Sequence, residues 1–354
     1  MNTNLIDAVA KAVLYEGYML YPYRASSVKN RQRFNFGVLY PKLYSEAQTG
    51  SDAWTMQTEC LVEVASPAIE VPAIEAPAIE IRVRFLKLVA RTSREIVEIT
   101  SGPWQEAIEC EVVIPPQNLD ALVATPLQWD FVFPAKEESE DLRDENGEIA
   151  GRIDRSQKSL QGTVLVNATP VEPDLFKLQV RVQNLTPLEG NPGQTSRDSA
   201  LMQSLVSAHT VLGAVNAQFV SLLEPPKGLK NLAASCENLG AWPVLVGAES
   251  QRDTMLASPI ILYDYPQIAP ESPGDLFDGT EIDEILALRI MTMTDDEKRE
   301  MRMTDDRACK ILERTEALPV ERAANSWPRG RPDGIERADR SCAGRCRKNG
   351  RVAD

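Results

Sequence analysis

Hydrophobic side chains near the N-terminus recur with the period of an α-helix. The spacing predicts a helix over residues 4–17, with its charged side chains mostly off the apolar face. The apolar positions are Leu5, Ile6, Val9, Val13 and Leu14. Pro22 follows shortly and prevents the helix from continuing, because the residue before a proline disfavours helical backbone.

The middle of the chain is rich in short apolar runs that are typical of β-strands. Leu178, Val180 and Val182 alternate with Gln179 and Arg181, which predicts a strand with one solvated face. Strands are expected at 34–40, 81–89, 96–99, 108–114, 129–133, 162–167, 175–182 and 258–265. A short helix is expected at 197–204 and a hairpin at 208–223. The charged run 136–148 is expected to be a solvated loop.

Helix-capping signals appear near the end of the body. Thr294 and Glu297 have the spacing of a capping box, and Thr280 and Thr304 stand in N-cap-like positions before acidic residues. Three consecutive short helices are therefore expected, at 281–291, 295–303 and 305–317. The predicted class is α+β, with a mainly antiparallel β-sheet or sandwich, an N-terminal helix and a C-terminal cluster of short helices.

The expected organisation is a β-rich body at 1–279, a helical region at 280–321 packed on that body, and a tail at 322–354. Within the body, residues 66–80 repeat Pro-Ala-Ile-Glu three times with a period of five. The prolines forbid a helix there, so the repeat is interpreted as an expanded loop or edge segment. The tail has no apolar period and is expected to be disordered or aberrant in sequence.

Composition narrows the function classes. The net charge of −14 disfavours a nucleic-acid-binding protein, which needs clustered cations. The charge is uneven, because residues 322–354 carry nine basic and four acidic side chains. Apolar runs are too short to span a membrane, and the N-terminus does not have the form of a signal peptide. Six scattered cysteines suggest no disulfide framework, so a cytoplasmic protein is expected.

Two sets of residues are candidates for catalysis or metal binding. His209 is the one histidine in the chain, so any general base of the histidine type would have to be this residue. The alternative is a structural histidine on a strand. Carboxylates are dense in 264–284, where Asp264, Glu271, Asp275 and Asp278 are weak candidates for a cation site. The alternative is helix capping and a solvated surface, and no cofactor or metal is expected.

A basic and aromatic segment near the N-terminus is the candidate partner-binding site. Aromatic rings and cations together can hold an anionic ligand or a protein partner. The alternative is that these cations pair with carboxylates of the protein itself. The residues concerned are Tyr21, Tyr23, Arg24, Lys29, Arg31 and Arg33.

Residues 13–24 (VLYEGYMLYPYR) and 258–283 (SPIILYDYPQIAPESPGDLFDGTEID) carry a family resemblance. The chain resembles an uncharacterised family of bacterial cytosolic proteins that is associated with [NiFe]-hydrogenase gene clusters. The resemblance covers most of 8–318, and the repeat and the last 33 residues depart from it. It implies an accessory or assembly role near a hydrogenase, with hydrogenase subunits or maturation factors as partners, and it transfers no catalytic residue.

Two hypotheses follow for the function. In the first, the protein is a non-catalytic accessory protein that binds a protein partner, and it does not act on nucleic acid or insert into a membrane. In the second, it is an enzyme or handles a metal or cofactor, with a site near His209 and the carboxylates of 264–284.

Overall fold

The computed structural model describes most of the chain between residues 3 and 317. The described residues are 3–24, 27–50, 52–64, 76–95, 104–143, 146–267, 283–304 and 306–317. They belong to one compact unit, Met1–Ala317, and the tail predicted at 322–354 lies outside them. The α+β class is confirmed, with two large antiparallel sheets, an N-terminal helix and short helices near residue 300.

One sheet has five strands, all paired antiparallel. In spatial order they are β10 (Ala217–Val220), β1 (Thr55–Val64), β8 (Leu175–Asn184), β7 (Leu160–Glu172) and β4 (Leu127–Phe133). The strands predicted at 129–133, 162–167 and 175–182 are therefore confirmed. Strand β1 was not predicted, because polar and apolar residues alternate irregularly along it.

The second sheet has seven strands and is built around the long strand β2 (Ala78–Glu95). Strand β3 (Trp104–Asn118) pairs with β2 along one edge. The other edge of β2 pairs first with β9 (Val206–Val215) and then with β6 (Ile149–Gln157). The remaining strands are β12 (Thr254–Ser258), β11 (Trp242–Leu245) and β5 (Lys136–Arg143).

The two sheets pack face to face and enclose the main hydrophobic core. Alternate residues of β2 point into it, namely Ile79, Ile81, Val83 and Phe85, each with 0% of its surface exposed. Leu178, Val180 and Val182 of β8 meet them from the other sheet, which confirms the alternation expected there. Two-residue periodicity thus places one apolar row of each strand in the sandwich.

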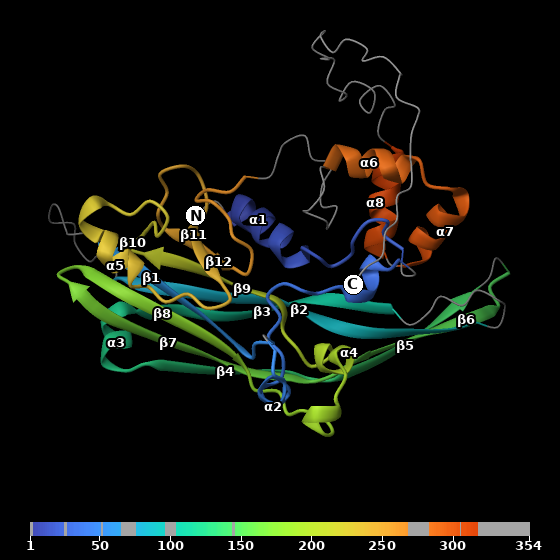
Figure 1. The fold of residues 1–354 in the computed structure, drawn as a ribbon, viewed down its shortest axis with the longest axis horizontal. Helices are drawn as coiled ribbons and strands as arrows, with labels where there is room; N and C mark the ends of the chain where they lie inside the picture. The colour runs from blue at the N-terminus through green and yellow to red at the C-terminus, as the bar shows by residue number, and fades with distance from the viewer. Residues whose placement is uncertain are drawn as a thin grey trace, which may run out of the picture. The chain divides into compact units, whose positions relative to one another are not determined.

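A helical layer covers the other face of the seven-stranded sheet, on one side of the sandwich (Figure 1). The predicted N-terminal helix is α1 (Thr3–Tyr15). Its apolar residues Val9 and Val13 pack on Val211 of β9 and Leu256 of β12. This contact explains the helical period at the N-terminus, because only one stripe of the helix meets the sheet.

The three C-terminal helices are also confirmed, as α6 (Asp283–Met291), α7 (Asp295–Thr304) and α8 (Asp306–Glu316). The capping box before α7 forms, because the Glu297 amide donates to Thr294 Oγ1 (3.3 Å) and the Thr294 amide donates to Glu297 Oε2 (2.9 Å). Apolar residues of α6 and α8, such as Ile290 and Leu312, join the cluster that contains Leu88 of β2.

Several short helices connect these layers. They are α2 (Lys42–Ala47), α3 (Leu119–Ala124), α4 (Arg197–Leu201), α5 (Lys230–Ala234), and the 3-10 turns η1 (Lys29–Gln32), η2 (Pro192–Gln194) and η3 (Lys227–Leu229). Helix α4 confirms the helix expected near 197–204. In the part of the chain that the structure describes, no helix combines the length and apolar character needed to cross a bilayer.

The prediction for the charged run in the middle of the chain was wrong. The run 136–148 was expected to be a loop, but its first eight residues form strand β5 on β6. Cross-strand ion pairs explain how so polar a strand forms, since Arg152 pairs with Asp141 (2.9 Å) and Arg155 with Glu140 (2.8 Å). Charged side chains are also typical of edge strands, where they discourage pairing with other chains.

Residues 208–223 do not form a simple hairpin. The chain turns at Asn216, which has a φ of 53°, and passes from β9 in one sheet to β10 in the other. The strand expected at 258–265 is also wrong, because β12 ends at Ser258. The strand-like run 34–40 makes only an isolated bridge, between Leu39 and Leu205. The strand expected at 96–99 lies outside the described residues.

The Pro-Ala-Ile-Glu repeat is part of the fold at its third copy, contrary to the loop prediction. Ala78, Ile79 and Glu80 open strand β2, and Ile79 is fully buried in the core. The strand can begin there because Pro77 precedes it and the remaining residues of that copy have backbone amides to donate. The first two copies lie outside the described residues.

We expect Ile79→Ala to lower the free energy of unfolding by about 2–5 kcal/mol, because it leaves a cavity between the sheets. Urea denaturation of the full chain measures this loss. Val113→Ala is the matched control on the neighbouring strand, where Val113 is 48% exposed, and it should cost less than about 1 kcal/mol. Equal losses in the two variants would contradict the placement of the third copy in the core.

Candidate functional site

Two residues of the predicted partner-binding segment are buried inside the protein. Tyr23 is 0% exposed and Arg33 is 6% exposed. The Arg33 guanidinium donates to the carbonyl oxygens of Tyr18 (3.2 Å) and Gln105 (2.9 Å), and its Cζ lies 3.5 Å from the ring centroid of Trp104. Planar stacking together with carbonyl acceptors is how an arginine can be buried at tolerable cost. These two side chains hold the segment in place.

Other residues of the segment contact the C-terminal helices. Arg24 lies 3.2 Å from Glu297 Oε1 in α7, and the Arg289 guanidinium of α6 lies 5.4 Å from the ring centroid of Tyr21. Lys29 is exposed in η1. Arg31 belongs to the same turn, and its side chain is outside the described set. Partner binding through Tyr21, Arg24, Lys29 and Arg31 stays a prediction.

His209 lies on β9 with 0% of its surface exposed, and its Nδ1 is 3.0 Å from the Ser207 carbonyl oxygen. Burial lowers the pKa of His209 to about 4, and the nearby positive charge of Arg84 acts in the same direction. The imidazole is therefore neutral at pH 7. A buried neutral imidazole with a backbone partner fits the structural alternative better than a general base that exchanges protons with a substrate.

Asp264 is used in internal hydrogen bonds. Its two carboxylate oxygens accept from the Ser221 hydroxyl (2.5 Å) and the Leu245 amide (2.8 Å), which ties the segment after β12 to β10 and β11. Glu271, Asp275 and Asp278 lie outside the described residues, so the cation site predicted for 264–284 stays a prediction. Among the described residues, no group of three or more His, Cys, Asp or Glu side chains is arranged to hold a metal ion.

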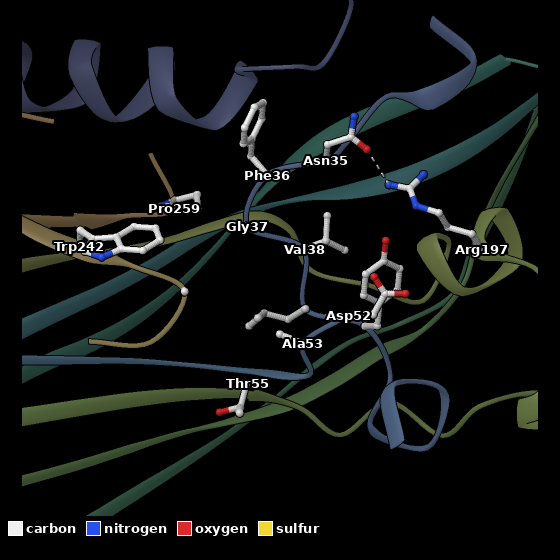
Figure 2. A pocket seen from close by; sticks show the side chains of 13 residues that line it. Asn35, Phe36, Gly37, Val38, Asp52, Ala53, Thr55, Arg197, Trp242 and Pro259 are labelled. Atoms are coloured by element: carbon white, nitrogen blue, oxygen red, sulfur yellow. Dashed lines mark hydrogen bonds between the residues drawn. The ribbon is translucent and has the colours of Figure 1, made fainter. Parts of the chain in front are cut away.

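The hollow drawn in Figure 2 is a candidate binding site that the sequence did not indicate. It has a volume of about 340 Å³ and lies where residues 35–40, the start of β1, α4 and β11 meet. Phe36, Trp242 and Pro259 line one end of it, and Arg197 and Asp52 line the other (Figure 2). We call this hollow the aromatic pocket. Its volume lies within the range of sites for small ligands and side-chain anchors.

Backbone hydrogen bonds fix the wall that carries Phe36. The Ala208 amide donates to the Gly37 carbonyl (2.8 Å), and the Tyr40 amide donates to the Ala53 carbonyl (2.8 Å). Gly37 has a φ of 55°, and a Cβ there would lie 2.5 Å from Pro259 Cγ. Only glycine lets the chain approach Pro259 so closely. The aromatic end of the pocket is therefore built on a rigid frame.

Arg197 fixes the polar end of the pocket. It donates to the Phe34 carbonyl (2.8 Å) and to Asn35 Oδ1 (3.2 Å). Burial raises the pKa of Tyr40, the adjacent Asp52 carboxylate adds to the rise, and Arg197 opposes it. The phenol stays protonated at neutral pH, so a bound group would meet a guanidinium, a carboxylate and a phenolic hydroxyl.

The rim of the aromatic pocket is exposed. Phe36 and Trp242 keep 43% and 41% of their surfaces accessible, which is high for such large apolar residues. The sequence gave little reason to join them, since more than 200 residues separate them. The Gly-Ala-Trp-Pro run at 240–243 was a weak signal, because glycine and proline mark turns, and a turn can leave an aromatic residue exposed.

Comparison with known proteins assigns no family to the chain. No protein-family model matches it, and no curated protein is significantly similar to it. The resemblance of residues 13–24 and 258–283 to the hydrogenase-associated family accordingly stays a prediction.

We expect the buried His209 to destabilise the protein in mild acid. Its pKa is about 4 in the folded state and about 6.5 when unfolded, so between these values the unfolded chain binds a proton that the folded chain does not. The stability present above pH 6.5 is thus lost as the pH falls toward 4. Between pH 7 and 5, the wild type should lose about 2 kcal/mol more unfolding free energy than His209→Gln.

Urea titrations of the two proteins at the two pH values measure this difference. Because His209 is the one histidine in the sequence, the variant isolates its titration from that of any other imidazole. Equal losses in wild type and variant would show that the imidazole titrates normally in the fold.

Proposed function

We propose that this protein is a non-catalytic accessory protein that binds a protein partner through the aromatic pocket. The observation that carries the proposal is the pair Phe36 and Trp242, both more than 40% exposed, at the rim of a hollow of about 340 Å³. Aromatic side chains in such positions dominate the energy of protein–protein contacts, because they lose a large apolar surface with few rotamers to fix.

The lining indicates what kind of group enters. An apolar side chain of the partner would pack between Phe36, Trp242 and Pro259, while its backbone or a polar tip would meet Arg197, Tyr40 or Asp52. The rigid frame around Gly37 supports this, because a preformed pocket costs little ordering entropy on binding. Pro259 is followed by Ile261 and Tyr263, which are 73% and 86% exposed and extend the apolar surface along the same loop.

The partner that we propose is a [NiFe]-hydrogenase subunit or maturation factor. This part of the proposal rests on the resemblance of residues 13–24 and 258–283. The binding contacts are argued from the aromatic pocket, and the identity of the partner is argued from the resemblance. The two parts can therefore be tested separately.

The first experiment is affinity purification of the tagged full-length protein from its native host, with quantitative mass spectrometry. Hydrogenase subunits or maturation factors should be captured in stoichiometric amounts. The captured partner is then purified and titrated against the wild type and against Phe36→Ala/Trp242→Ala. We expect the double variant to bind at least about tenfold more weakly, because two central aromatic contacts are lost.

Val132→Ala is the control, since Val132 is an exposed apolar residue (64%) on β4 and does not line the pocket. Its affinity for the partner should match that of the wild type. Unaltered binding by the double variant would overturn docking at the pocket. Capture without any hydrogenase protein would overturn the proposed partner.

A further inference from the structure

The polar end of the aromatic pocket carries two opposite charges that are not paired with each other. Arg197 and Asp52 are the two charged residues of its described lining, so the formal charges of the lining cancel. In the described chain neither side chain forms an ion pair. Arg197 donates to neutral oxygens of residues 33–35, and the Asp52 carboxylate accepts from the Tyr44 hydroxyl. The pocket is therefore lined by a cation and an anion that both keep their charges.

Both charges act on the same neutral group, the phenol of Tyr40. Burial has the largest effect on the pKa of Tyr40 and raises it, Arg197 lowers it, and Asp52 raises it further. Each charge therefore lies close enough to the phenol to affect it. Figure 2 shows both side chains at the end of the pocket that lies away from Trp242. A ligand with a carboxylate and an ammonium on one carbon atom can meet two charges that lie this close together.

The other end of the pocket is apolar. Phe36, Trp242 and Pro259 line it, and the first two keep more than 40% of their surfaces exposed. A ligand that enters covers aromatic surface that is otherwise in contact with water, which favours binding. The volume of about 340 Å³ is near the lower end of the range for small-ligand sites, so it suits one compact molecule.

We propose that the aromatic pocket binds a free α-amino acid with a large apolar side chain, and that this ligand regulates partner docking by occupying the pocket. The carboxylate of the ligand accepts from Arg197, and its ammonium group donates to Asp52, in charge-assisted hydrogen bonds. Its side chain packs between Phe36 and Trp242. The regulation rests on the proposed function, whereas the binding of the amino acid does not.

The cancelling charges of the lining favour a zwitterion over a singly charged ligand. A ligand with one charge leaves either Arg197 or Asp52 covered without a counter-charge, and removing a charge from water without a partner is unfavourable. An amino acid supplies both counter-charges at once and brings no net charge into the pocket. The aromatic end adds a second requirement, which is a side chain whose transfer out of water is favourable.

Isothermal titration calorimetry of the full-length protein with L-phenylalanine tests the binding. Two analogues each lack one charge: 3-phenylpropionate has no ammonium group, and phenethylamine has no carboxylate. L-phenylalanine should bind saturably below about 5 mM and about tenfold more tightly than either analogue, because each analogue loses one charge-assisted hydrogen bond. L-phenylalaninamide, which resembles the N-terminal residue of a peptide, should also bind about tenfold more weakly.

Asp52→Asn should change the affinities for two of these ligands in opposite directions. The affinity for L-phenylalanine should fall about tenfold, because its ammonium group loses a counter-charge. The affinity for 3-phenylpropionate should rise about threefold, because this anion no longer meets a like charge. Asp120→Asn is the matched control, since it removes an exposed carboxylate of α3 outside the pocket, and it should leave both affinities unchanged.

The amino-acid site is overturned if L-phenylalanine does not bind, or if an analogue or the amide binds as tightly. It is also overturned if Asp52→Asn, shown to be folded by circular dichroism, changes the two affinities in the same direction. The comparison of ligands uses the wild-type protein, so the test stays decisive even if the variant folds poorly.

The regulation is tested with the partner captured from the native host. L-phenylalanine at about ten times its dissociation constant should weaken partner binding about tenfold, because the two compete for one pocket. Unaltered partner binding at that concentration overturns the regulation. If L-phenylalanine fails to bind while partner binding depends on Phe36 and Trp242, only the amino-acid site is overturned. If L-phenylalanine binds while Phe36→Ala/Trp242→Ala leaves partner binding unaltered, docking and its regulation are overturned and the amino-acid site stands.

Discussion

Strand β2 must bury both of its faces, and most of the structure follows from that constraint. Its inward row, from Ile79 to Phe85, fills the space between the sheets, while Leu86 and Leu88 face the helical layer. A strand that is apolar on both sides is stable only with a covering layer on each. The five-stranded sheet covers one face of β2 and helices cover the other, and the turn at Asn216 carries the chain from one sheet to the other.

The helical layer brings charged residues into the interior at its junction with the sheet. Arg33 is stacked on Trp104 beneath this layer, and Arg307 of α8 donates to the Ala107 carbonyl of β3 (3.3 Å). Leaving a buried guanidinium without partners would cost several kcal/mol, whereas carbonyl acceptors and ring faces offset most of the desolvation. Tyr21, Arg24 and Arg33 thus connect the C-terminal helices to the sheet. That role explains the mixture of aromatic and cationic residues in this part of the chain.

Local signals were enough to predict α1, α4 and the three C-terminal helices. They did not predict the short helices α2, α3 and α5 or all of the strands. The capping box at Thr294 predicted the first residue of α7 correctly, because the cap depends only on the four residues from Thr294 to Glu297. Strand β1 escaped prediction because its buried polar side chains are satisfied by distant partners: Glu59 Oε2 accepts from the amide of Glu237 (2.8 Å), far away in sequence. Phe36 and Trp242 were missed for the same reason, since only the tertiary fold brings them to one hollow. Arg33 was predicted as a partner-binding cation. The sequence could not tell whether its guanidinium faces solvent or donates to carbonyl oxygens inside the protein.

Arg197 borders the aromatic pocket and shows how a guanidinium can be fixed in an acidic protein without an ion pair. Elsewhere arginines are neutralised: Arg84 lies within 4 Å of carboxylates of Asp7, Glu109 and Glu111. Within the described chain, no carboxylate lies at ion-pair distance from Arg197, whose partners are carbonyl and amide oxygens of residues 33–35. Those dipoles fix the guanidinium and leave its net charge in place. Asp52 lines the same end of the aromatic pocket, so an occupant there meets a cation and an anion that are not paired with each other. The same contacts hold residues 33–35 in place beside the aromatic pocket, so an occupant meets a surface that is already fixed.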